Sequence, residues 1–268
     1  MSYNGYKVID SHCHIYPEKI VDKAVPATDR FYDVKSACRG TVSDLIENGC
    51  GAGVDMFIVQ SVATTPKQVN SINEFIAYEV SQNKEKLIGL GTLHPDSENL
   101  TEDVKHLMEL GLKGVKLHPD IQAFKIDDYR CLKIYELCEA NGLPILMHTG
   151  DNRYDYSNPN RLIPVLDIYK DLTVIGAHMG GWSIWEEASK QLADKPNLYV
   201  DCSSSFYYLS LDTAKEIIKR YGTDKVLFGT DYPMWSPKAE LDTFFSLELS
   251  DEDNRRVLSE NAIRVFNI

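Results

Sequence analysis

Short apolar runs and amphipathic stretches alternate along the whole chain. The apolar runs have the length and the Val, Ile and Leu content of buried strands, and they cover residues 9–14, 54–59, 87–95, 114–119, 144–148, 173–178, 198–201 and 226–231. Apolar residues at helical spacing predict helices over 42–48, 68–80, 104–110, 129–140 and 163–169, and a last helix that begins at Ser250. Residues 16–40 break the alternation, because Pro17 and Pro26 interrupt a polar segment, and we expect an irregular active-site loop there.

Eight strands that each precede a helical stretch predict an α/β fold of the (β/α)₈ TIM-barrel type. The strands start mostly 20 to 35 residues apart, and the length of 268 residues is close to the roughly 250 that such barrels use as one domain. The chain has no Gly-x-Gly-x-x-Gly sequence, which an open dinucleotide-binding sheet would favour. We therefore expect one TIM-barrel domain over residues 1–268.

The histidines follow this strand pattern closely. Six of the seven, and one aspartate, stand at the carboxyl ends of predicted strands, namely His12, His14, His94, His118, His148, His178 and Asp231. The carboxyl ends of barrel strands line one mouth, where active sites of this fold lie. His106 is the exception, because it falls inside a predicted helix and is expected on the surface.

His12 and His14 form the first candidate metal site. Side chains two residues apart in a strand share a face, and their Cα atoms lie roughly 6.5 Å apart, so both imidazoles can reach one ion. Asp10 could orient one of the rings. Three imidazoles, one carboxylate and an open water position are typical of a catalytic divalent metal, most often zinc. The alternative is a pair of hydrogen-bonded polar residues at a strand end.

Charge and composition limit the kinds of molecule that the protein is expected to bind. A formal net charge of -12 disfavours nucleic acids and anionic membranes, since both are bound through clustered Lys and Arg. No apolar run approaches the roughly 18 residues of a membrane span, and the first residues lack a signal-peptide pattern, so we expect a cytoplasmic protein with a small-molecule substrate. A homo-oligomer remains open. The six cysteines form no Cys-x-x-Cys pair and are expected to be reduced thiols.

Several motifs together resemble the amidohydrolase superfamily, in particular its amidohydrolase-related branch, which includes aminocarboxymuconate-semialdehyde decarboxylase and other aromatic-acid decarboxylases. The motifs are Ile-Asp-Ser-His-Cys-His at 9–14, Gly-Val-Lys-Leu-His-Pro at 114–119, Pro-Ile-Leu-Met-His-Thr at 144–149, Ala-His-Met-Gly-Gly at 177–181, Phe-Gly-Thr-Asp-Tyr-Pro at 228–233 and Glu-Asn-Ala at 260–262. The likeness runs through essentially the whole chain.

The resemblance implies a mononuclear metal enzyme. By it, one divalent ion, Zn²⁺ as first choice and Mn²⁺ or another transition metal as alternatives, is held by His12, His14, His148 and Asp231. Asp231 would also take a proton from the metal-bound water, and His178 would stand beside the ion and shuttle a proton or polarise the scissile group.

The leading expectation is a hydrolase that acts on an amide, ester or lactone bond. The alternative is non-oxidative decarboxylation of an unsaturated or aromatic acid, although such relatives are longer after the first strand. Lys116, His118 and Trp182 are the expected substrate-binding residues. In binuclear relatives a carboxylated lysine on the fourth strand bridges two metals. Because Lys116 lies on the fourth predicted strand, binding of a second metal ion is a further alternative.

Two other classes compete with these enzymes. TatD-like deoxyribonucleases share the His-x-His opening, but they predict a ligating Glu on the fourth strand, where this chain has Lys116 and His118. A non-catalytic metal-binding barrel predicts that a ligand or an acid/base residue is missing. The presence of His148, His178 and Asp231 argues against it.

Overall fold

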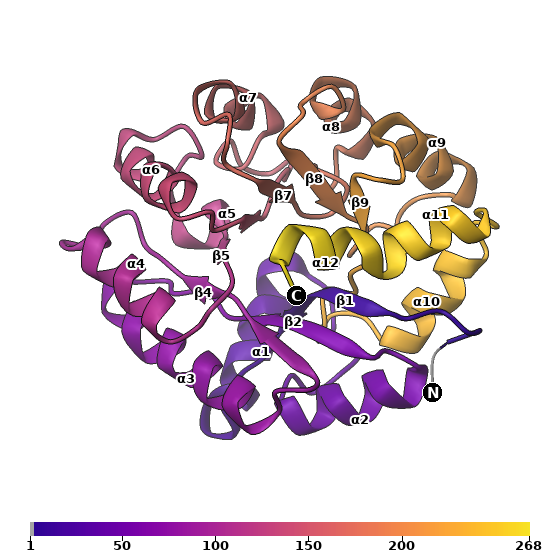
Figure 1. The fold of residues 1–268 in the computed structure, drawn as a ribbon, viewed down its shortest axis with the longest axis horizontal. Helices are drawn as coiled ribbons and strands as arrows, with labels where there is room; N and C mark the ends of the chain where they lie inside the picture. The colour runs from indigo at the N-terminus through magenta and orange to yellow at the C-terminus, as the bar shows by residue number, and fades with distance from the viewer. Residues whose placement is uncertain (1–2) are drawn as a thin grey trace.

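The computed structural model describes residues 3–268 and shows a ring of parallel strands surrounded by helices (Figure 1). The strands pair in two runs, β1-β2-β3 and β4-β5-β6-β7-β8-β9. Their bounds are β1 Ile9–His14, β2 Met56–Gln60, β3 Leu87–Gly89, β4 Gly91–Thr92, β5 Val115–Leu117, β6 Ile145–Met147, β7 Val174–Gly176, β8 Leu198–Asp201 and β9 Val226–Leu227. Every predicted strand is present.

Backbone hydrogen bonds close the two runs into a barrel. The third predicted strand is split into β3, which pairs with β2, and β4, which pairs with β5. At the other seam, the Ser11 N–H donates to the Phe228 carbonyl at 2.9 Å, and the His14 N–H donates to the Tyr232 carbonyl at 2.6 Å. The predicted (β/α)₈ barrel is therefore confirmed.

Helices cover the outside of the ring (Figure 1). Among residues 3–268, no helix combines the length and the apolar character that crossing a membrane requires. The α-helices are α1 Glu18–Tyr32, α2 Val42–Ala52, α3 Val69–Gln82, α4 Leu100–Glu109, α5 Pro119–Gln122, α6 Leu132–Ala140, α7 Pro159–Ile168, α8 Trp185–Leu192, α9 Leu211–Tyr221, α10 Pro237–Phe245, α11 Asp251–Arg255 and α12 Asn261–Phe266. Short 3₁₀ turns at Pro66–Gln68 and Tyr129–Cys131 precede α3 and α6, and a π-helical turn at Arg256–Glu260 joins α11 to α12.

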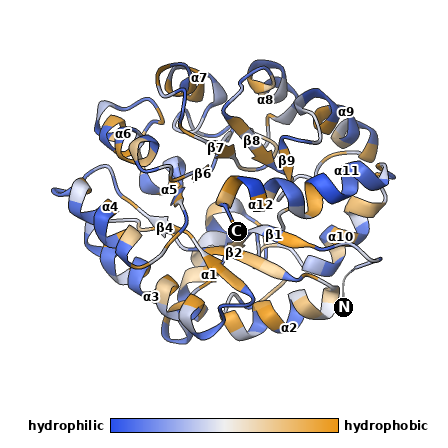
Figure 2. Ribbon diagram, in the orientation of Figure 1, coloured by the Kyte–Doolittle hydropathy of each residue, from blue (hydrophilic) through white to orange (hydrophobic). Residues whose placement is uncertain are grey.

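Apolar side chains fill the barrel in two layers. The outer layer lies between the strands and the helices, whose outward faces are polar (Figure 2). The inner cluster joins one aliphatic side chain from most strands to Ala262 and Phe266 of α12. In Figure 1, α12 lies across one end of the ring and closes it. The strand members of this inner cluster are Ile9, Ile58, Leu146, Ile175 and Leu227, and Leu90 between β3 and β4 and Ala177 directly after β7 complete it.

The prediction of an irregular loop over residues 16–40 is wrong. Most of it is the helix α1, which contains Pro26. A proline inside a helix removes one hydrogen bond and costs about 3 kcal/mol. The buried side chains of Val21 and Val25 lie on one face of α1, and such packing of an amphipathic face outweighs local propensity.

Strand β1 contains a bulge that includes the first histidine. Asp10 pairs with Phe57 and Cys13 pairs with Val59, so two residues of β1 stand opposite one residue of β2. An extra residue breaks the alternation of faces. The bulge explains how Ile9 can belong to the inner apolar cluster while His12, three residues later, faces the polar end of the same barrel.

Candidate metal centre and active site

One cavity of about 550 Å³ opens at the carboxyl ends of the strands and collects most of the predicted site residues. His12 and His14 come from β1, Lys116 from β5, and the others from the loops that follow β5, β6, β7 and β9. The predicted site residues in its lining are His12, His14, Lys116, His118, His148, His178 and Asp231. His94 is not part of this lining, and Trp182 lines a smaller neighbouring cavity instead.

Three of the four predicted ligands form a compact group. The Nε2 atoms of His12 and His14 are 3.2 Å apart, and Asp231 Oδ1 lies 3.3 Å and 3.6 Å from them. Ligands about 2.1 Å from a tetrahedral zinc ion are separated from one another by about 3.4 Å. The three donor atoms therefore have the spacing of one face of a tetrahedral metal site.

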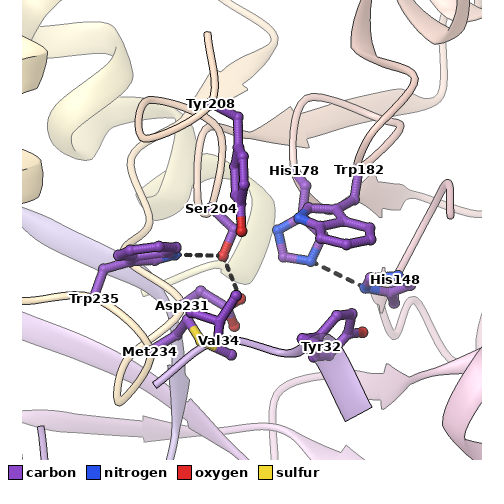
Figure 3. Close-up of a pocket in the computed structure, with 10 residues that line it drawn as sticks. All are labelled: Tyr32, Val34, His148, His178, Trp182, Ser204, Tyr208, Asp231, Met234 and Trp235. Carbon is purple, nitrogen blue, oxygen red and sulfur yellow. Dashed lines mark hydrogen bonds between the residues drawn. The ribbon is translucent and has the colours of Figure 1, made fainter. Parts of the chain in front are cut away.

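His148, the fourth predicted ligand, stands next to this group rather than within it. Its Nδ1 lies 3.0 Å from His178 Nε2 (Figure 3). Its Nε2 is buried and makes no hydrogen bond to any described residue, and Asp120 Oδ2 is 3.4 Å away. An unpartnered buried imidazole nitrogen fits a ligand, so His148 remains a predicted member of the set.

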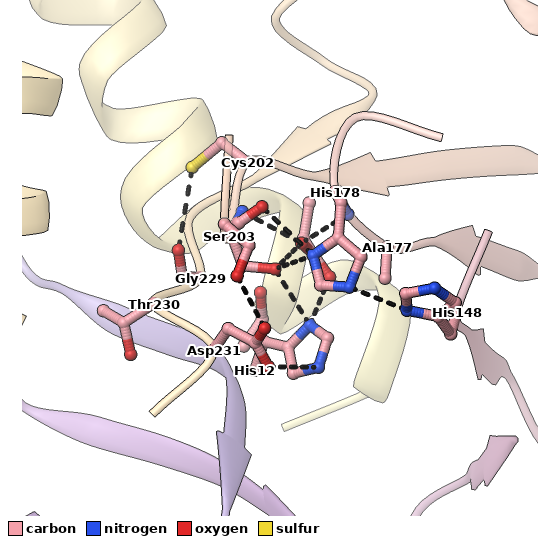
Figure 4. A network of polar contacts seen from close by, with 12 residues as sticks. His12, His148, Ala177, His178, Cys202, Ser203, Gly229, Thr230 and Asp231 are labelled. Atoms are coloured by element: carbon pink, nitrogen blue, oxygen red, sulfur yellow. Dashed lines mark hydrogen bonds and ion pairs between the residues drawn. The ribbon is translucent and has the colours of Figure 1, made fainter. Parts of the chain in front are cut away.

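Asp201 and Ser203 orient the two central imidazoles, and sequence reasoning missed both. Figure 4 shows Ser203 beside His12 and His178. Asp201 Oδ2 lies 2.9 Å from His12 Nδ1. The Ser203 hydroxyl donates to Asp201 Oδ1 at 2.5 Å and lies 2.9 Å from His178 Nδ1. Such partners fix the tautomer and direction of a metal-binding imidazole. The available signal was that Asp201 ends a predicted strand, as the rim histidines do.

Asp10, which the sequence suggested as a partner for an imidazole, forms side-chain hydrogen bonds with Thr230. Its carboxylate accepts hydrogen bonds from the Thr230 N–H at 3.0 Å and the Thr230 hydroxyl at 2.6 Å. These bonds tie β1 to the loop that carries Asp231. Asp10 therefore helps to hold two ligand-bearing segments together.

A second polar chain holds Asp231. The Ser204 hydroxyl donates to Asp231 Oδ2 at 2.6 Å, and the Trp235 Nε1–H donates to Ser204 Oγ at 2.8 Å (Figure 3). One carboxylate oxygen of Asp231 is thereby occupied, and Oδ1 faces the two histidines. Trp182, Tyr208 and Trp235 wall the smaller cavity above this point.

Burial controls the charge of the site. It lowers the pKa of His14, His118 and His148 well below the usual value, and it lowers the pKa of His178 to about 4. These imidazoles are therefore neutral near pH 7, which is the form that binds metals. The pKa of Lys116 falls to about 8 for the same reason.

The pKa values of the two buried carboxylates, Asp201 and Asp231, are not set by burial alone. Burial alone would raise the pKa of Asp201 and of Asp231, but the electrostatic effect of the neighbouring His12 and His178, together with hydrogen bonds from Ser203 to Asp201 and from Ser204 to Asp231, outweighs it. Both pKa values lie below the usual range, so both groups are anionic. The site thus combines neutral imidazoles with negative oxygen donors.

Two site residues have strained backbones. His178 has φ 59° and Asp231 has φ 58°, and neither residue is glycine. The left-handed region costs roughly 1–2 kcal/mol for a residue with a Cβ atom. Such outliers cluster at functional sites, where the surrounding structure holds them. The polar contacts of both side chains described above supply that restraint.

The comparisons with known proteins agree with this geometry. The sequence profile of the family described as "Amidohydrolase" (Amidohydro_2) matches residues 9–268. The chain belongs to the amidohydrolase family. The expected amidohydrolase-related branch is confirmed, and the protein is an enzyme.

A curated relative of this amidohydrolase is 2-amino-3-carboxymuconate-6-semialdehyde decarboxylase from Dictyostelium discoideum. The two are 24% identical over an alignment of length 161, which covers 54% of this chain and 42% of the relative. The match thus spans less than half the length of that relative.

Solved structures show the same fold. An uncharacterised TIM-barrel protein from Bordetella bronchiseptica has a TM-score of 0.82 and 23% identity, with 97% of this chain and 98% of that chain covered. The 5-carboxyvanillate decarboxylase from Sphingomonas paucimobilis has a TM-score of 0.77 and 17% identity, with 98% and 100% covered.

Two of the three predicted substrate-binding residues, Lys116 and His118, lie on the floor and wall of the amidohydrolase cavity. Lys116 is fully buried, and its Nζ lies 3.0 Å from His12 Nε2. The His118 ring stacks on the His148 ring with centroids 4.0 Å apart, and its Nε2 is 2.6 Å from the Tyr32 hydroxyl. The contribution of Tyr32 was missed because α1 was not expected to be a helix.

Arg153 is committed to structure rather than free for a substrate. It forms an ion pair with the buried Asp151 at 2.7 Å and donates to the Phe31 carbonyl at 2.6 Å. These contacts tie the loop after β6 to the carboxyl end of α1.

Proposed function

We propose that this amidohydrolase catalyses the metal-dependent, non-oxidative decarboxylation of an unsaturated or aromatic carboxylic acid. The proposal takes the alternative expectation from the sequence in place of the first one. It is supported by the curated relative from Dictyostelium discoideum and by the structure from Sphingomonas paucimobilis, because both are decarboxylases. Hydrolysis is supported by the general character of the family.

The observation that carries the proposal is the two-part lining of the cavity. Its floor holds the metal-binding candidates and Lys116, whereas its walls are largely apolar. A carboxylate bound at the floor exchanges its hydration for the fixed groups there, while the apolar walls exclude water from the conjugated carbon framework on which charge develops. Removal from water therefore favours departure of CO₂ over retention of the carboxylate.

The residues have separate roles in this reaction. His12, His14 and Asp231 would hold a divalent ion, with His148 as the expected fourth ligand, and the bound ion would supply positive charge that orients the acid. The C–C bond to the carboxylate breaks, CO₂ leaves, and the electron pair that remains on carbon takes a proton. A water in the site would supply that proton, and we assign its relay to the carbon to His178 or Asp231, because both line the cavity next to the ligand group.

Hydrolysis of a lactone, ester or amide is the second candidate. The tetrahedral spacing of His12, His14 and Asp231 favours it, because this arrangement suits a metal-activated water. In that case His178 would polarise the carbonyl or protonate the leaving group. Zn²⁺ and Mn²⁺ both suit this donor set.

A product assay separates the two reactions. Protein reconstituted with Zn²⁺ or Mn²⁺ is given a panel of hydroxybenzoates, lactones and esters, and CO₂ release and acid release are measured separately. We expect CO₂ from at least one aromatic acid, loss of that activity in His178→Ala, and no loss in the control His106→Ala, whose side chain lies on α4 outside the cavity. Acid release from lactones or esters without any CO₂ would contradict the proposal and support hydrolysis.

A further inference from the structure

The large cavity continues well beyond the polar floor, between α1 and the start of α3. Two rows of residues at helical spacing face each other across it. The first row belongs to α1 and contains Ile20, Ala24, Ala27, Thr28 and Phe31. The second runs from the loop before α3 into that helix and contains Thr64, Gln68, Ser71, Ile72 and Phe75. We call this part of the cavity the α1/α3 channel.

Charge is distributed very unevenly along the cavity. All its histidines, Lys116 and Asp231 gather at the barrel end. In the α1/α3 channel, Lys19 is the charged residue of the described lining, and it is exposed at the surface. The cavity therefore has a charged head and an apolar arm. A molecule with both parts would match it.

The channel leaves apolar side chains open to water. Ile20 is 42% exposed, and Ile72 and Phe75 are half-buried. Leaving apolar area in water costs about 25 cal/mol per Å², and a contiguous apolar surface of this kind marks a ligand groove more often than an ordinary surface. The inner surface of α1 also carries the small residues Ala24 and Ala27, which leave width for a ligand.

The volume of the cavity also fits a molecule that has both a charged part and an apolar part. Its volume of about 550 Å³ lies within the range of about 300–1,000 Å³ that holds drug-sized ligands. A small acid bound at the floor would leave the α1/α3 channel unfilled. The extra room is continuous with the reacting centre, so a single molecule can occupy both parts.

We propose that the substrate is a carboxylic acid with an apolar arm, and that the arm binds in the α1/α3 channel while the carboxylate lies on the polar floor. This inference rests on the proposed function for the position of the carboxylate. It adds the chemical class of the remainder of the substrate, and it assigns α1 and α3 as the elements that select for it.

Binding of butanoate, hexanoate and octanoate to the metal-loaded protein, measured by titration calorimetry, tests the arm without requiring turnover. Each methylene that enters the channel should tighten binding about fourfold, which corresponds to about 0.8 kcal/mol per buried CH₂. Octanoate should then bind about 200-fold more tightly than butanoate.

Variants place that gain in the channel. Ala24→Phe should reduce the difference between octanoate and butanoate to less than about tenfold, with the affinity for butanoate kept, because a phenyl ring fills the room that the arm needs. Ala27→Phe is a second variant at the same wall. Lys23→Phe is the matched control, since it adds the same ring to α1 at an exposed residue outside the lining. Melting temperatures confirm that each variant is folded.

The outcomes separate this inference from the proposed function. Equal affinity for butanoate and octanoate, or an unchanged chain-length effect in both alanine variants, would overturn the arm site even if the enzyme decarboxylates short acids. A chain-length effect that Ala24→Phe or Ala27→Phe removes and Lys23→Phe keeps supports the arm site, even if the panel of aromatic acids yields no CO₂.

Discussion

The two ends of this barrel bury opposite kinds of side chain. The end covered by α12 is filled by aliphatic residues and by Phe266. The other end buries His12, Lys116 and Asp201, each fully removed from solvent. Burying polar groups without partners costs free energy, and here a network of hydrogen bonds offsets much of that cost. The same strands thus provide stability at one end and chemistry at the other.

The largest effect is expected at the polar end, from His148→Ala. If His148 completes the ligand set, the variant should lose most of its metal and all measurable turnover, and it should keep its fold because the apolar end is untouched. Elemental analysis measures the metal content, a turnover assay the activity, and circular dichroism the fold. Metal retained at one ion per chain would show that His12, His14 and Asp231 suffice, and two ions per wild-type chain would indicate a second site at Lys116.

His178→Ala should separate metal binding from catalysis at the same end. The variant should keep its metal, because both ring nitrogens of His178 already have protein partners, Ser203 Oγ and His148 Nδ1, whereas the Nε2 atom of His148 has none among the described residues. Turnover should fall about 10²- to 10⁴-fold, the usual contribution of a general acid or base. Steady-state kinetics and metal content, measured on one sample, test whether the two functions separate. A loss of metal in this variant would show that His178 is a metal ligand.

Phe266→Ala should affect only the closed end. Truncation of a buried Phe costs about 3–5 kcal/mol, and Phe266 is 3% exposed in the inner cluster. Urea unfolding should show a loss near the lower limit of that range, with metal content unchanged. Ile168→Ala is the control, since Ile168 is 65% exposed and should change stability little. A loss of metal without a loss of stability would contradict the division between the two ends.

The smallest effect is expected from Glu240→Gln, which should change how the free energy of unfolding depends on pH. Burial, with the nearby charges of Asp10 and Asp231, raises the pKa of Glu240 from 4.5 to about 8, and its Oε2 has no hydrogen-bond partner among the described residues. The folded protein thus keeps a proton that the unfolded chain releases above pH 4.5. Stability from this group is complete below pH 4.5 and is lost as the pH rises to about 8, by at most about 1.4 kcal/mol per pH unit.

Urea unfolding at pH 6 and pH 8 measures this difference. The wild type should lose more stability between the two values than Glu240→Gln, because glutamine carries no proton to release. Asp120 titrates in both proteins, so its contribution cancels in the comparison. Identical pH dependence in the two proteins would mean that Glu240 is ionised in the folded state.

The sequence by itself determined the order of strands and helices, the barrel and the rim of histidines. These follow from local periodicity and from the rule that strand ends meet at one mouth. The motifs also determined the amidohydrolase family, because they extend over the whole chain. The conformation of residues 16–40 could not be predicted, since Pro17 and Pro26 argue against a helix that packing nevertheless stabilises.

Only the tertiary structure decided which rim residues touch. The bulge in β1 sets the direction of His12, and barrel closure brings Asp201 to that ring from 189 residues away in sequence. It also places His148 beside His178 and outside the compact group that contains His14 and Asp231. Strand register, backbone strain and the packing of α1 fix these distances, and none of them is a property of a local stretch of sequence.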